Sequence, residues 1–279
     1  MTQQKVVFEN TSLPDIVELR DVSLTYDGGK TFIIQNLNLL IEERGTGQFV
    51  SILGPSGCGK STILRFLAGL QKPTTGQALI FGKSQTEKDR VGMVFQKYSS
   101  FPWLTVLENA ELGLKIQGIN AKERKERAMD MLRMVGIQDQ YKKYAQYPTL
   151  SGGQLQRVAI ARSLLACPQI MLLDEAFGAL DIKTRLEMQE MICKLWSDLS
   201  KKNHATTFLL VTHDISEAVY LGDDVLIMSN PPAQIIDRIH IDLPLDRTRD
   251  MKKSDYFKNT VAIIEDKMMN LEQKKIGGS

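Results

Sequence analysis

Strand-length apolar runs dominate the N-terminal part of the chain. They cover residues 16–19, 22–26, 32–41 and 49–53 and are separated by polar or glycine-containing turns. A segment with three glycines, residues 54–59, ends the last run. Apolar residues then return at helical spacing, at positions 63, 64, 67 and 70. The pattern predicts strands first, and then a glycine-rich loop that leads into a helix.

The remaining pattern alternates between strands and helices. Further strands are predicted at residues 78–81, 91–95, 170–173, 208–211 and 234–241, whereas residues 99–166 have a helical pattern. A final helix is predicted near 254–273, and we expect its apolar stripe to pack on its own domain; the stripe is formed by Phe257, Val261, Ile264, Met268 and Leu271. This alternation predicts an α/β fold with a mainly parallel sheet, interrupted by a helical insert.

Composition excludes several classes of protein. The 279 residues carry 35 Lys+Arg against 33 Asp+Glu, so a net charge of +2 disfavours a general nucleic-acid binder. The charge run at 122–127 mixes both signs, which is typical of a solvated helix face. Cys58, Cys167 and Cys193 are too few for a disulfide framework and have no metal-ligand spacing. With no signal peptide and no long apolar run, we expect a cytosolic protein whose membrane role, if any, depends on a partner.

The strongest chemical signal is a phosphate-binding loop between a predicted strand and a predicted helix. Its residues fit the pattern G-x-x-x-x-G-K-[ST] and are Gly54, Pro55, Ser56, Gly57, Cys58, Gly59, Lys60 and Ser61, followed by Thr62. Glycines let backbone N–H groups surround phosphate oxygens, and the helix N-terminus adds positive charge. Lys60 supplies a cation for the β- and γ-phosphates, and Ser61 offers a hydroxyl to Mg²⁺. The alternative is a chance match in a glycine-rich turn.

Two further motifs accompany this loop. Asp174 and Glu175 follow a buried strand, where Asp174 fits an acid that reaches Mg²⁺ through water and Glu175 fits the group that polarises the attacking water. Alone, such a pair could be a solvated strand end. Residues 150–154 precede a helix, with Ser151 as its N-cap and Gly152 and Gly153 exposing backbone N–H groups as a second anion site. Alone, they could be a simple capped helix.

Together these motifs resemble an ATP-binding cassette (ABC) ATPase over about residues 16–240. The order and spacing of the loop, Gln96, residues 150–154, Asp174-Glu175, Asp181 and His213 carry the resemblance. Within that superfamily the chain looks most like the ATP-binding subunit of nitrate, sulfonate or taurine importers. The closer likeness is carried by residues 101–109, 177–181, 195–196 and 212–218.

The resemblance implies a role for each matching residue. Tyr26 would stack on adenine, although it could be an ordinary strand tyrosine. Gln96 would reach Mg²⁺ and the water and report to the membrane subunit, and His213 would contact the γ-phosphate. Ser151, Gly152, Gly153 and Gln154 would serve the ATP of the opposite subunit, and Asp181 would link the two sites. The implied metal ligands are Ser61, Gln96 and Asp174. His204 and His240 match no motif and are read as structural or surface residues.

The resemblance also implies an organisation in three parts. Residues 1–98 and 167–241 would form the ATP-binding core, which combines a RecA-like part with an antiparallel β subdomain. Residues 99–166 would form the inserted helical subdomain that carries Ser151, and 242–279 a C-terminal extension. Three departures stand out: Ala176 replaces a usual proline and could loosen the turn, residues 42–47 are longer than usual, and Cys58 lies inside the loop. We expect bulky thiol reagents to inhibit hydrolysis through Cys58, and ATP to protect.

The implied function is hydrolysis of ATP with Mg²⁺ to power an importer of a small solute. Its partners would be integral membrane permease subunits, a second ATP-binding subunit in a homodimer and an external solute-binding protein, with no nucleic acid. The chain would lie peripherally on the cytoplasmic face of the inner membrane. An ABC ATPase of a lipid-transport or export system is the alternative. A two-cassette translation factor or a coiled-coil chromosome ATPase does not fit, because the chain has one cassette and a short interval between residues 54 and 150.

Overall fold

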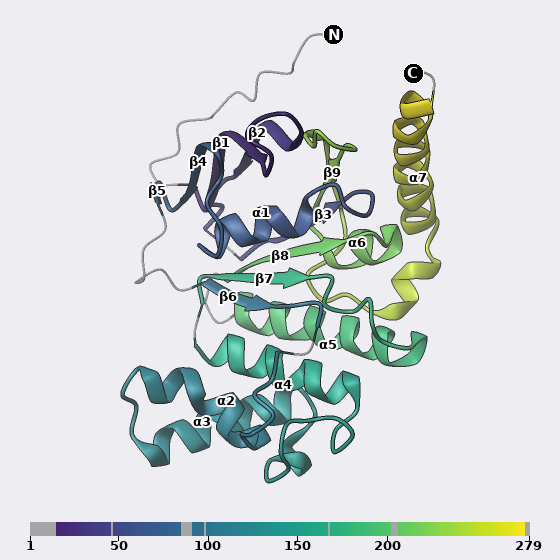
Figure 1. Ribbon diagram of the computed structural model, residues 1–279. Helices are drawn as coiled ribbons and strands as arrows, with labels where there is room; N and C mark the ends of the chain where they lie inside the picture. The colour runs from purple at the N-terminus through teal and green to yellow at the C-terminus, as the bar shows by residue number, and fades with distance from the viewer. Residues whose placement is uncertain are drawn as a thin grey trace.

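The computed structural model describes residues 15–45, 47–84, 91–97, 99–166, 168–201 and 206–276, with side chains to 271. Cys167 and His204 lie outside the described residues. The chain forms two sheets and a set of helices (Figure 1), so the predicted α/β class is confirmed. None of the helices in these ranges is both long and apolar enough to cross a membrane.

The smaller sheet is antiparallel and has the strand order β2-β1-β4-β5. Its strands are β1 (Val17–Thr25), β2 (Phe32–Ile41), β4 (Thr75–Ile80) and β5 (Lys83–Ser84). The two strands predicted at 16–19 and 22–26 are in fact one strand, interrupted by a register shift between Leu19 and Val22. Asp21 takes a positive φ of 47° at that point, and its N–H donates to Asn38 Oδ1 at 3.0 Å. A local kink therefore imitates a turn in the sequence pattern.

The larger sheet has the strand order β10-β9-β3-β8-β7-β6 and is parallel except for the edge strand β10. Its strands are β3 (Phe49–Leu53), β6 (Val91–Val94), β7 (Ile170–Asp174), β8 (Thr207–Thr212), β9 (Asp224–Met228) and β10 (Ile235–His240). Strand β9 was not predicted. It pairs with β3 on one side and with β10 on the other, so it connects the edge strand to the sheet.

Alternate residues of the parallel strands face two separate hydrophobic cores. In β7, Met171 and Leu173 belong to one core, whereas Ile170 and Leu172 belong to the other. This alternation follows from the two-residue repeat of a strand, and it explains why the run reads as continuously apolar. One core lies towards the helices α2 to α7, and the other lies between the sheet, α1 and the antiparallel sheet.

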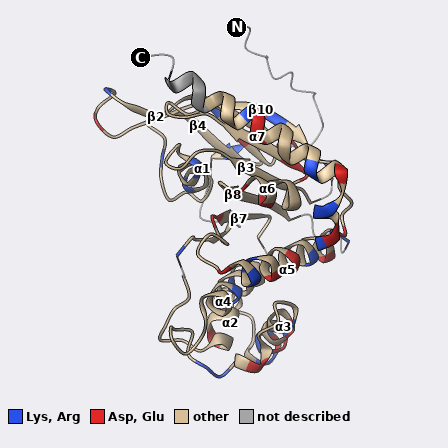
Figure 2. Cartoon of the chain, turned by 90° about the vertical axis from the view of Figure 1, so that its right-hand side faces the viewer, with Lys and Arg blue, Asp and Glu red and all other residues tan. Residues whose placement is uncertain are grey.

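The helices are α1 (Lys60–Leu67), α2 (Val106–Ile116), α3 (Ala121–Met134), α4 (Gly152–Leu165), α5 (Ile182–Lys201), α6 (Ile215–Leu221) and α7 (Asp255–Ile276), with short 3₁₀ turns at Gln138–Gln140 and Arg249–Lys253. Helices α2, α3 and α4 lie together at one end of the molecule (Figure 1). The predicted charge run lies on α3, which carries both signs on its exposed surface (Figure 2). Phe257 and Ile264 of α7 are buried in the core shared with α6, so the final helix packs on its own chain as predicted.

Candidate functional site

The phosphate-binding loop connects β3 to α1 at the carboxyl end of the parallel sheet. Gly57 and Gly59 have φ values of 77° and 103°, a backbone region that side-chain-bearing residues rarely adopt. A Cβ at Gly54 would lie 3.0 Å from both Cys58 Sγ and Met228 Cβ. The loop thus needs glycines for its backbone path and for its close approach to β9, and Gly59 is the N-cap of α1.

Lys60 is held inside this loop. Its side chain is nearly buried, and Nζ donates to the carbonyl oxygens of Gly54 and Pro55, each at 2.8 Å. Nζ also lies 3.9 Å from Glu175 Oε1. The lysine amine therefore lies inside the loop at the N-terminus of α1, and a lysine, loop amides and a helix N-terminus are the groups that bind phosphate oxygens.

Ser61 and Asp174 meet at the next position. Ser61 Oγ donates to Asp174 Oδ1 at 2.6 Å, and Asp174 is 6% exposed. Burial raises the pKa of Asp174, and the hydrogen bond from Ser61 opposes that rise. The described residues contain no cluster of three His, Cys, Asp or Glu side chains that could hold a metal alone. A hydroxyl and one carboxylate do fit Mg²⁺, which commonly binds to one or two protein oxygens and to substrate phosphates.

Glu175 is the point on which the other predicted catalytic residues converge. Its Oε2 accepts from Gln96 Nε2 at 3.0 Å and lies 3.6 Å from His213 Nδ1. The Glu175 backbone has a positive φ of 45°, and its N–H donates to Val211 O on β8 at 3.0 Å. Side chains from three segments, following β3, β6 and β8, are thus brought to the Glu175 carboxylate after β7.

The turn after Glu175 is closed although Ala176 stands where a proline was expected. Gly178 N–H donates to Glu175 O at 3.1 Å, and Ala176 is buried. Asp214 caps α6, because its Oδ1 accepts from Glu217 N–H at 2.9 Å. His213 therefore lies directly before a capped helix, and this helix fixes its backbone.

Ser151 and Gln154 form a reciprocal cap at the start of α4. Gln154 N–H donates to Ser151 Oγ at 3.3 Å, and Ser151 N–H donates to Gln154 Oε1 at 2.9 Å. Within the described residues, no hydrogen bond or ion pair joins residues 151–154 to the phosphate-binding loop. The structure brings this segment to α5 instead. A Cβ on Gly153 would lie 2.4 Å from Thr184 Cγ2, and Asp181 Oδ1 accepts from Thr184 N at 3.0 Å.

Tyr26, predicted to stack on adenine, and Cys58 of the phosphate-binding loop differ in exposure. Tyr26 is 68% exposed, and its hydroxyl accepts from Gln71 Nε2 at 2.9 Å, so its ring is free to stack on a flat ligand. Cys58 is fully buried, and burial raises the pKa of its thiol. Since the thiolate is the reactive species, the expected sensitivity of Cys58 to bulky thiol reagents is not supported by this environment.

Comparisons with known proteins show the family of the chain. A family model described as ABC transporter matches residues 34–178. The nitrate import ATP-binding protein NrtD of Synechocystis sp. is 44% identical over 234 residues, which are 82% of this chain and 84% of that protein. The taurine import ATP-binding protein TauB of Pseudomonas aeruginosa is 41% identical over 79% of this chain and 81% of its own length. The aliphatic sulfonates import ATP-binding protein SsuB of Bacillus cereus is 39% identical over 90% and 91%.

Solved structures give the same result for the fold. The dimeric bacterial ABC transporter cassette MJ0796 matches with a TM-score of 0.68 and 34% identity, over 82% of this chain and 100% of that chain. The same cassette in a post-hydrolysis state bound to ADP and Pi matches with a TM-score of 0.68 and 33% identity, over the same shares of the two chains.

Proposed function

We propose, from the premise that this chain belongs to the ABC transporter family of ATP-binding proteins, that it powers uptake of a small solute related to nitrate, taurine or an aliphatic sulfonate. The chain is an ATPase. The observation that carries this function is the convergence of Lys60, Gln96 and His213 on Glu175, next to the phosphate-binding loop.

In this proposal Glu175 accepts the proton of the attacking water. Gln96 and His213 both approach Oε2 of its carboxylate, and Lys60 approaches Oε1, so these side chains orient the carboxylate and the water in front of the γ-phosphate. Lys60 leaves the loop carbonyls to bind the β- and γ-phosphates, and the loop amides and the α1 N-terminus hold the remaining oxygens. Ser61, Asp174 and Gln96 would hold Mg²⁺, which neutralises phosphate charge when bound.

The catalytic unit would be a homodimer with two ATP sites. Ser151, Gly152, Gly153 and Gln154 lie apart from the chain's own loop, which fits a role on the ATP of the second subunit. Asp181 is close to this segment through Thr184, so it would link the two sites. ATP held between both subunits stabilises the dimer by linkage, and hydrolysis releases it.

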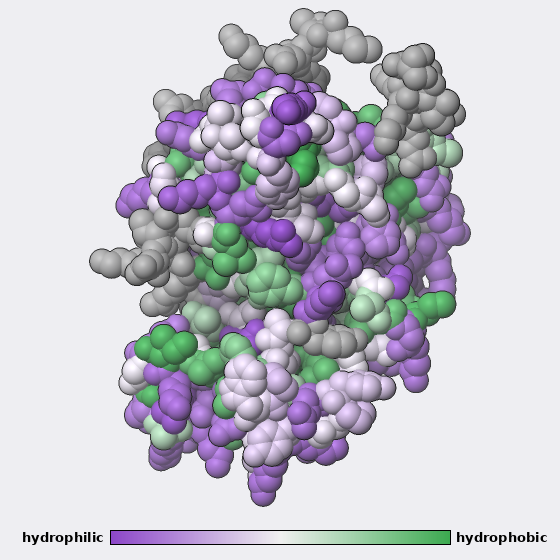
Figure 3. All heavy atoms as spheres, in the orientation of Figure 1, coloured by the Kyte–Doolittle hydropathy of each residue, from purple (hydrophilic) through white to green (hydrophobic). Residues whose placement is uncertain are grey.

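The helical end is the surface we propose for the membrane permease subunits. It exposes several large apolar or aromatic side chains, and Figure 3 shows apolar atoms gathered over the α2 and α3 end. Those most exposed in this region are Trp103 at 68%, Ile116 at 79% and Tyr147 at 76%. Exposed apolar groups of this kind are typical of protein contacts. The chain would thus lie peripherally on the cytoplasmic face of the inner membrane.

Purification from native membranes in mild detergent tests the importer proposal. We expect a multispanning permease to accompany the chain, and reconstituted ATP hydrolysis to rise when a solute-loaded external binding protein is added. Recovery with ribosomes or DNA-bound factors, or without any membrane protein, would contradict the transport function and leave the ATPase intact. Stimulation by lipid instead of a binding protein would favour the lipid-transport or export alternative.

A further inference from the structure

The segment that follows β10 holds both ends of α6, the seven-residue helix that begins two residues after His213. Two cations make these contacts, Arg247 at the C-terminal end of α6 and Lys252 at its N-terminal end. Neither belongs to a motif of the sequence. These contacts affect the site because His213 directly precedes the N-cap of α6, so the position of α6 determines where the His213 backbone lies relative to Glu175.

Arg247 satisfies the carbonyl groups at the end of α6. Its side chain is 0% exposed, and Nη1 donates to Tyr220 O and to Gly222 O, each at 3.1 Å. Nη2 donates to Asp223 Oδ1 at 2.6 Å, and the guanidinium lies over the Trp196 ring at 5.4 Å. Helix ends leave their last carbonyls without intrahelical partners, and a cation also suits the negative end of the helix dipole.

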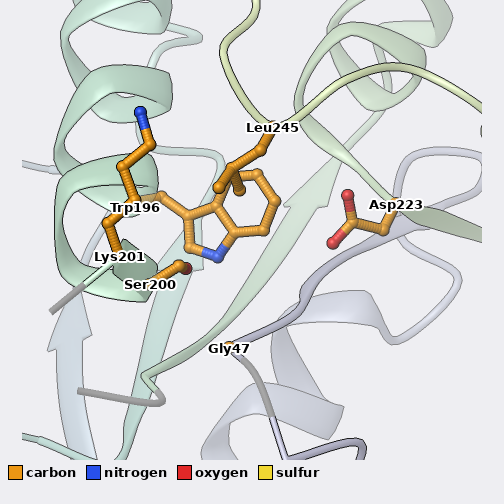
Figure 4. A pocket seen from close by; sticks show the side chains of 6 residues that line it. All are labelled: Gly47, Trp196, Ser200, Lys201, Asp223 and Leu245. Carbon is orange, nitrogen blue, oxygen red and sulfur yellow. The ribbon is translucent and has the colours of Figure 1, made fainter. Parts of the chain in front are cut away.

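The same region borders a cavity at the amino end of the parallel strands (Figure 4). Trp196 comes from α5, Asp223 from the turn between α6 and β9, and Leu245 from the C-terminal segment, and all three line the cavity. Arg247 therefore connects α5, the turn between α6 and β9, and the C-terminal segment at a place where side chains leave a cavity between them. We expect the position of these three elements to depend on the Arg247 cation more than on apolar packing.

Lys252 reaches the other end of α6 through one intermediate side chain. Its Nζ donates to Gln189 Oε1 at 2.8 Å, and Gln189 Nε2 donates to Glu217 Oε1 at 2.9 Å. Gln189 and Glu217 are 2% and 4% exposed. Nζ also lies 4.2 Å from the centre of the Tyr220 ring of α6. These two hydrogen bonds fix the orientation of the Gln189 amide, because its oxygen accepts from Lys252 and its nitrogen donates to Glu217.

Glu217 connects Lys252 and Gln189 to the two residues on either side of His213. Its side chain hydrogen-bonds Thr212, and its N–H donates to Asp214 Oδ1 at 2.9 Å. Asp214 N–H in turn donates to Thr212 Oγ1 at 3.0 Å. His213 lies between Thr212 and Asp214, so both of its neighbours are held by a network whose outer member is Lys252.

We infer that Arg247 and Lys252 are positioning residues that hold α6, and thereby His213, in place at Glu175. This inference rests on the proposed role of His213 in hydrolysis. It gives the start of the C-terminal extension a function: the extension closes a network around α6 that the catalytic motifs leave open.

Lys252→Met in the full-length chain tests this inference, with Lys253→Met as a matched control. Lys253 is the next residue, and its ion pair with Asp250 is exposed to solvent. We expect Lys252→Met to lower kcat about 10-fold with unchanged affinity for ADP, because misplacement of a catalytic group affects the reaction and not the phosphate-binding loop. Lys252→Arg, which can donate to the same amide oxygen, should recover most of kcat, and Lys253→Met should leave it unchanged.

The ring signals of His213 provide a readout that general destabilisation does not predict. The chain has only 3 histidines, so two-dimensional NMR of ¹⁵N-histidine-labelled protein resolves them, with His213→Ala for assignment. We expect the His213 signals to move in Lys252→Met and to stay in Lys253→Met. In a His213→Ala background, Lys252→Met should produce no further loss in single-turnover hydrolysis.

Two results would overturn the inference. One is a Lys252→Met protein with unchanged kcat and unchanged His213 signals; the other is an equal loss of rate in the presence and absence of His213. If Lys252→Met does not fold, Gln189→Met breaks the middle link and is judged by the same readouts. Absence of hydrolysis in the unaltered chain would instead overturn the proposed function and this inference together.

Discussion

The two ends of the parallel sheet hold charged groups in different ways. At the carboxyl end, the His213 side chain is 56% exposed, Glu175 is 18% exposed, and Lys60 is bound to loop carbonyls that a phosphate can replace. At the amino end, the Arg247 side chain is 0% exposed and donates to two carbonyl groups at the end of α6 and to the Asp223 carboxylate. In the proposed function, phosphate replaces contacts at the carboxyl end, whereas the contacts of Arg247 are buried, so changes at the carboxyl end should affect activity alone and changes at Arg247 should also lower stability.

The largest effect should follow Glu175→Gln. The amide keeps the shape of the side chain and its contact with Gln96 but cannot accept the proton of water. We expect the rate of phosphate release to fall about 10²–10⁴-fold, as is typical for loss of a general base. The unfolding midpoint should stay close to that of the unaltered chain, and light scattering should detect a dimer in ATP.

Glu126→Gln is the control for this prediction. Glu126 lies on the exposed face of α3, in the mixed charge run. It should hydrolyse ATP at the normal rate. If Glu175→Gln did the same, Glu175 would not be the base, and the convergence of side chains on it would need another explanation.

Arg247→Met, unlike Glu175→Gln, should have a large effect on stability in addition to its effect on the position of His213. Removing the cation leaves two helix-end carbonyls without this donor, and it leaves the partly buried Asp223 carboxylate with the Phe49 N–H but no neutralising cation. We expect the free energy of unfolding in urea to fall by about 3–5 kcal/mol, the usual cost of breaking a buried pair from one side. Lys253→Met, which removes an exposed pair, should cost less than about 1 kcal/mol. Equal losses for the two variants would contradict the proposed difference between the two ends.

The residues at the proposed catalytic end were largely predictable from the sequence, because each group of them belongs to a short segment. The loop 54–61 is defined by glycine positions and by its flanking strand and helix, and Asp174 and Glu175 by the end of one apolar run. Nothing local links Gln189, Glu217 and Lys252, since they come from three segments and meet only in the folded chain. The supporting network therefore requires the structure.

Fold prediction was limited for similar reasons. Strand β9 has five residues and directly follows α6, and a short apolar run after a helix cannot be distinguished from the helix by periodicity. The kink at Asp21 divided β1 into two predicted strands, because a polar residue with positive φ imitates a turn. By contrast, α7 has a sustained helical stripe and was predicted nearly at its observed bounds.

A smaller effect on dimerisation is expected from a change in residues 151–154, the segment proposed to bind the ATP of the second subunit, where it contacts α5. In Gly153→Ala, the new methyl group would approach Thr184 Cγ2 at 2.4 Å, so α4 or α5 must shift at a cost of about 1–3 kcal/mol. We expect weaker ATP-driven dimerisation in a Glu175→Gln background, measured by light scattering, with unchanged ADP binding to the monomer. Thr184→Ser removes the opposing methyl and should restore dimerisation. Failure of this second change to restore it would assign the defect to a direct contact of Gly153.

The smallest effect should be seen at Asp27, beside Tyr26. The Asp27 carboxylate accepts from the N–H groups of Thr31 and Lys30 and from the Thr25 hydroxyl. These hydrogen bonds lower the pKa of Asp27 from its ordinary value of 3.8, and the bond from Thr31 N–H has the largest effect. A lowered pKa means that the carboxylate stabilises the fold above pH 3.8 and that this contribution is lost as pH falls through the folded-state pKa.

Asp27→Asn should therefore make the acid side of the stability profile less steep. The asparagine oxygen can still accept hydrogen bonds but has no charge to lose, so urea unfolding between about pH 5 and about pH 2 should show a weaker pH dependence than in the unaltered chain. Asp21→Asn is the matched control, because Asp21 is on the same sheet and its carboxylate accepts from Asn38 and not from the residues of this turn. Since Asp27 shapes the turn next to Tyr26, a variant that keeps the pH profile but loses ATP affinity would show that this turn acts through the aromatic ring and not through stability.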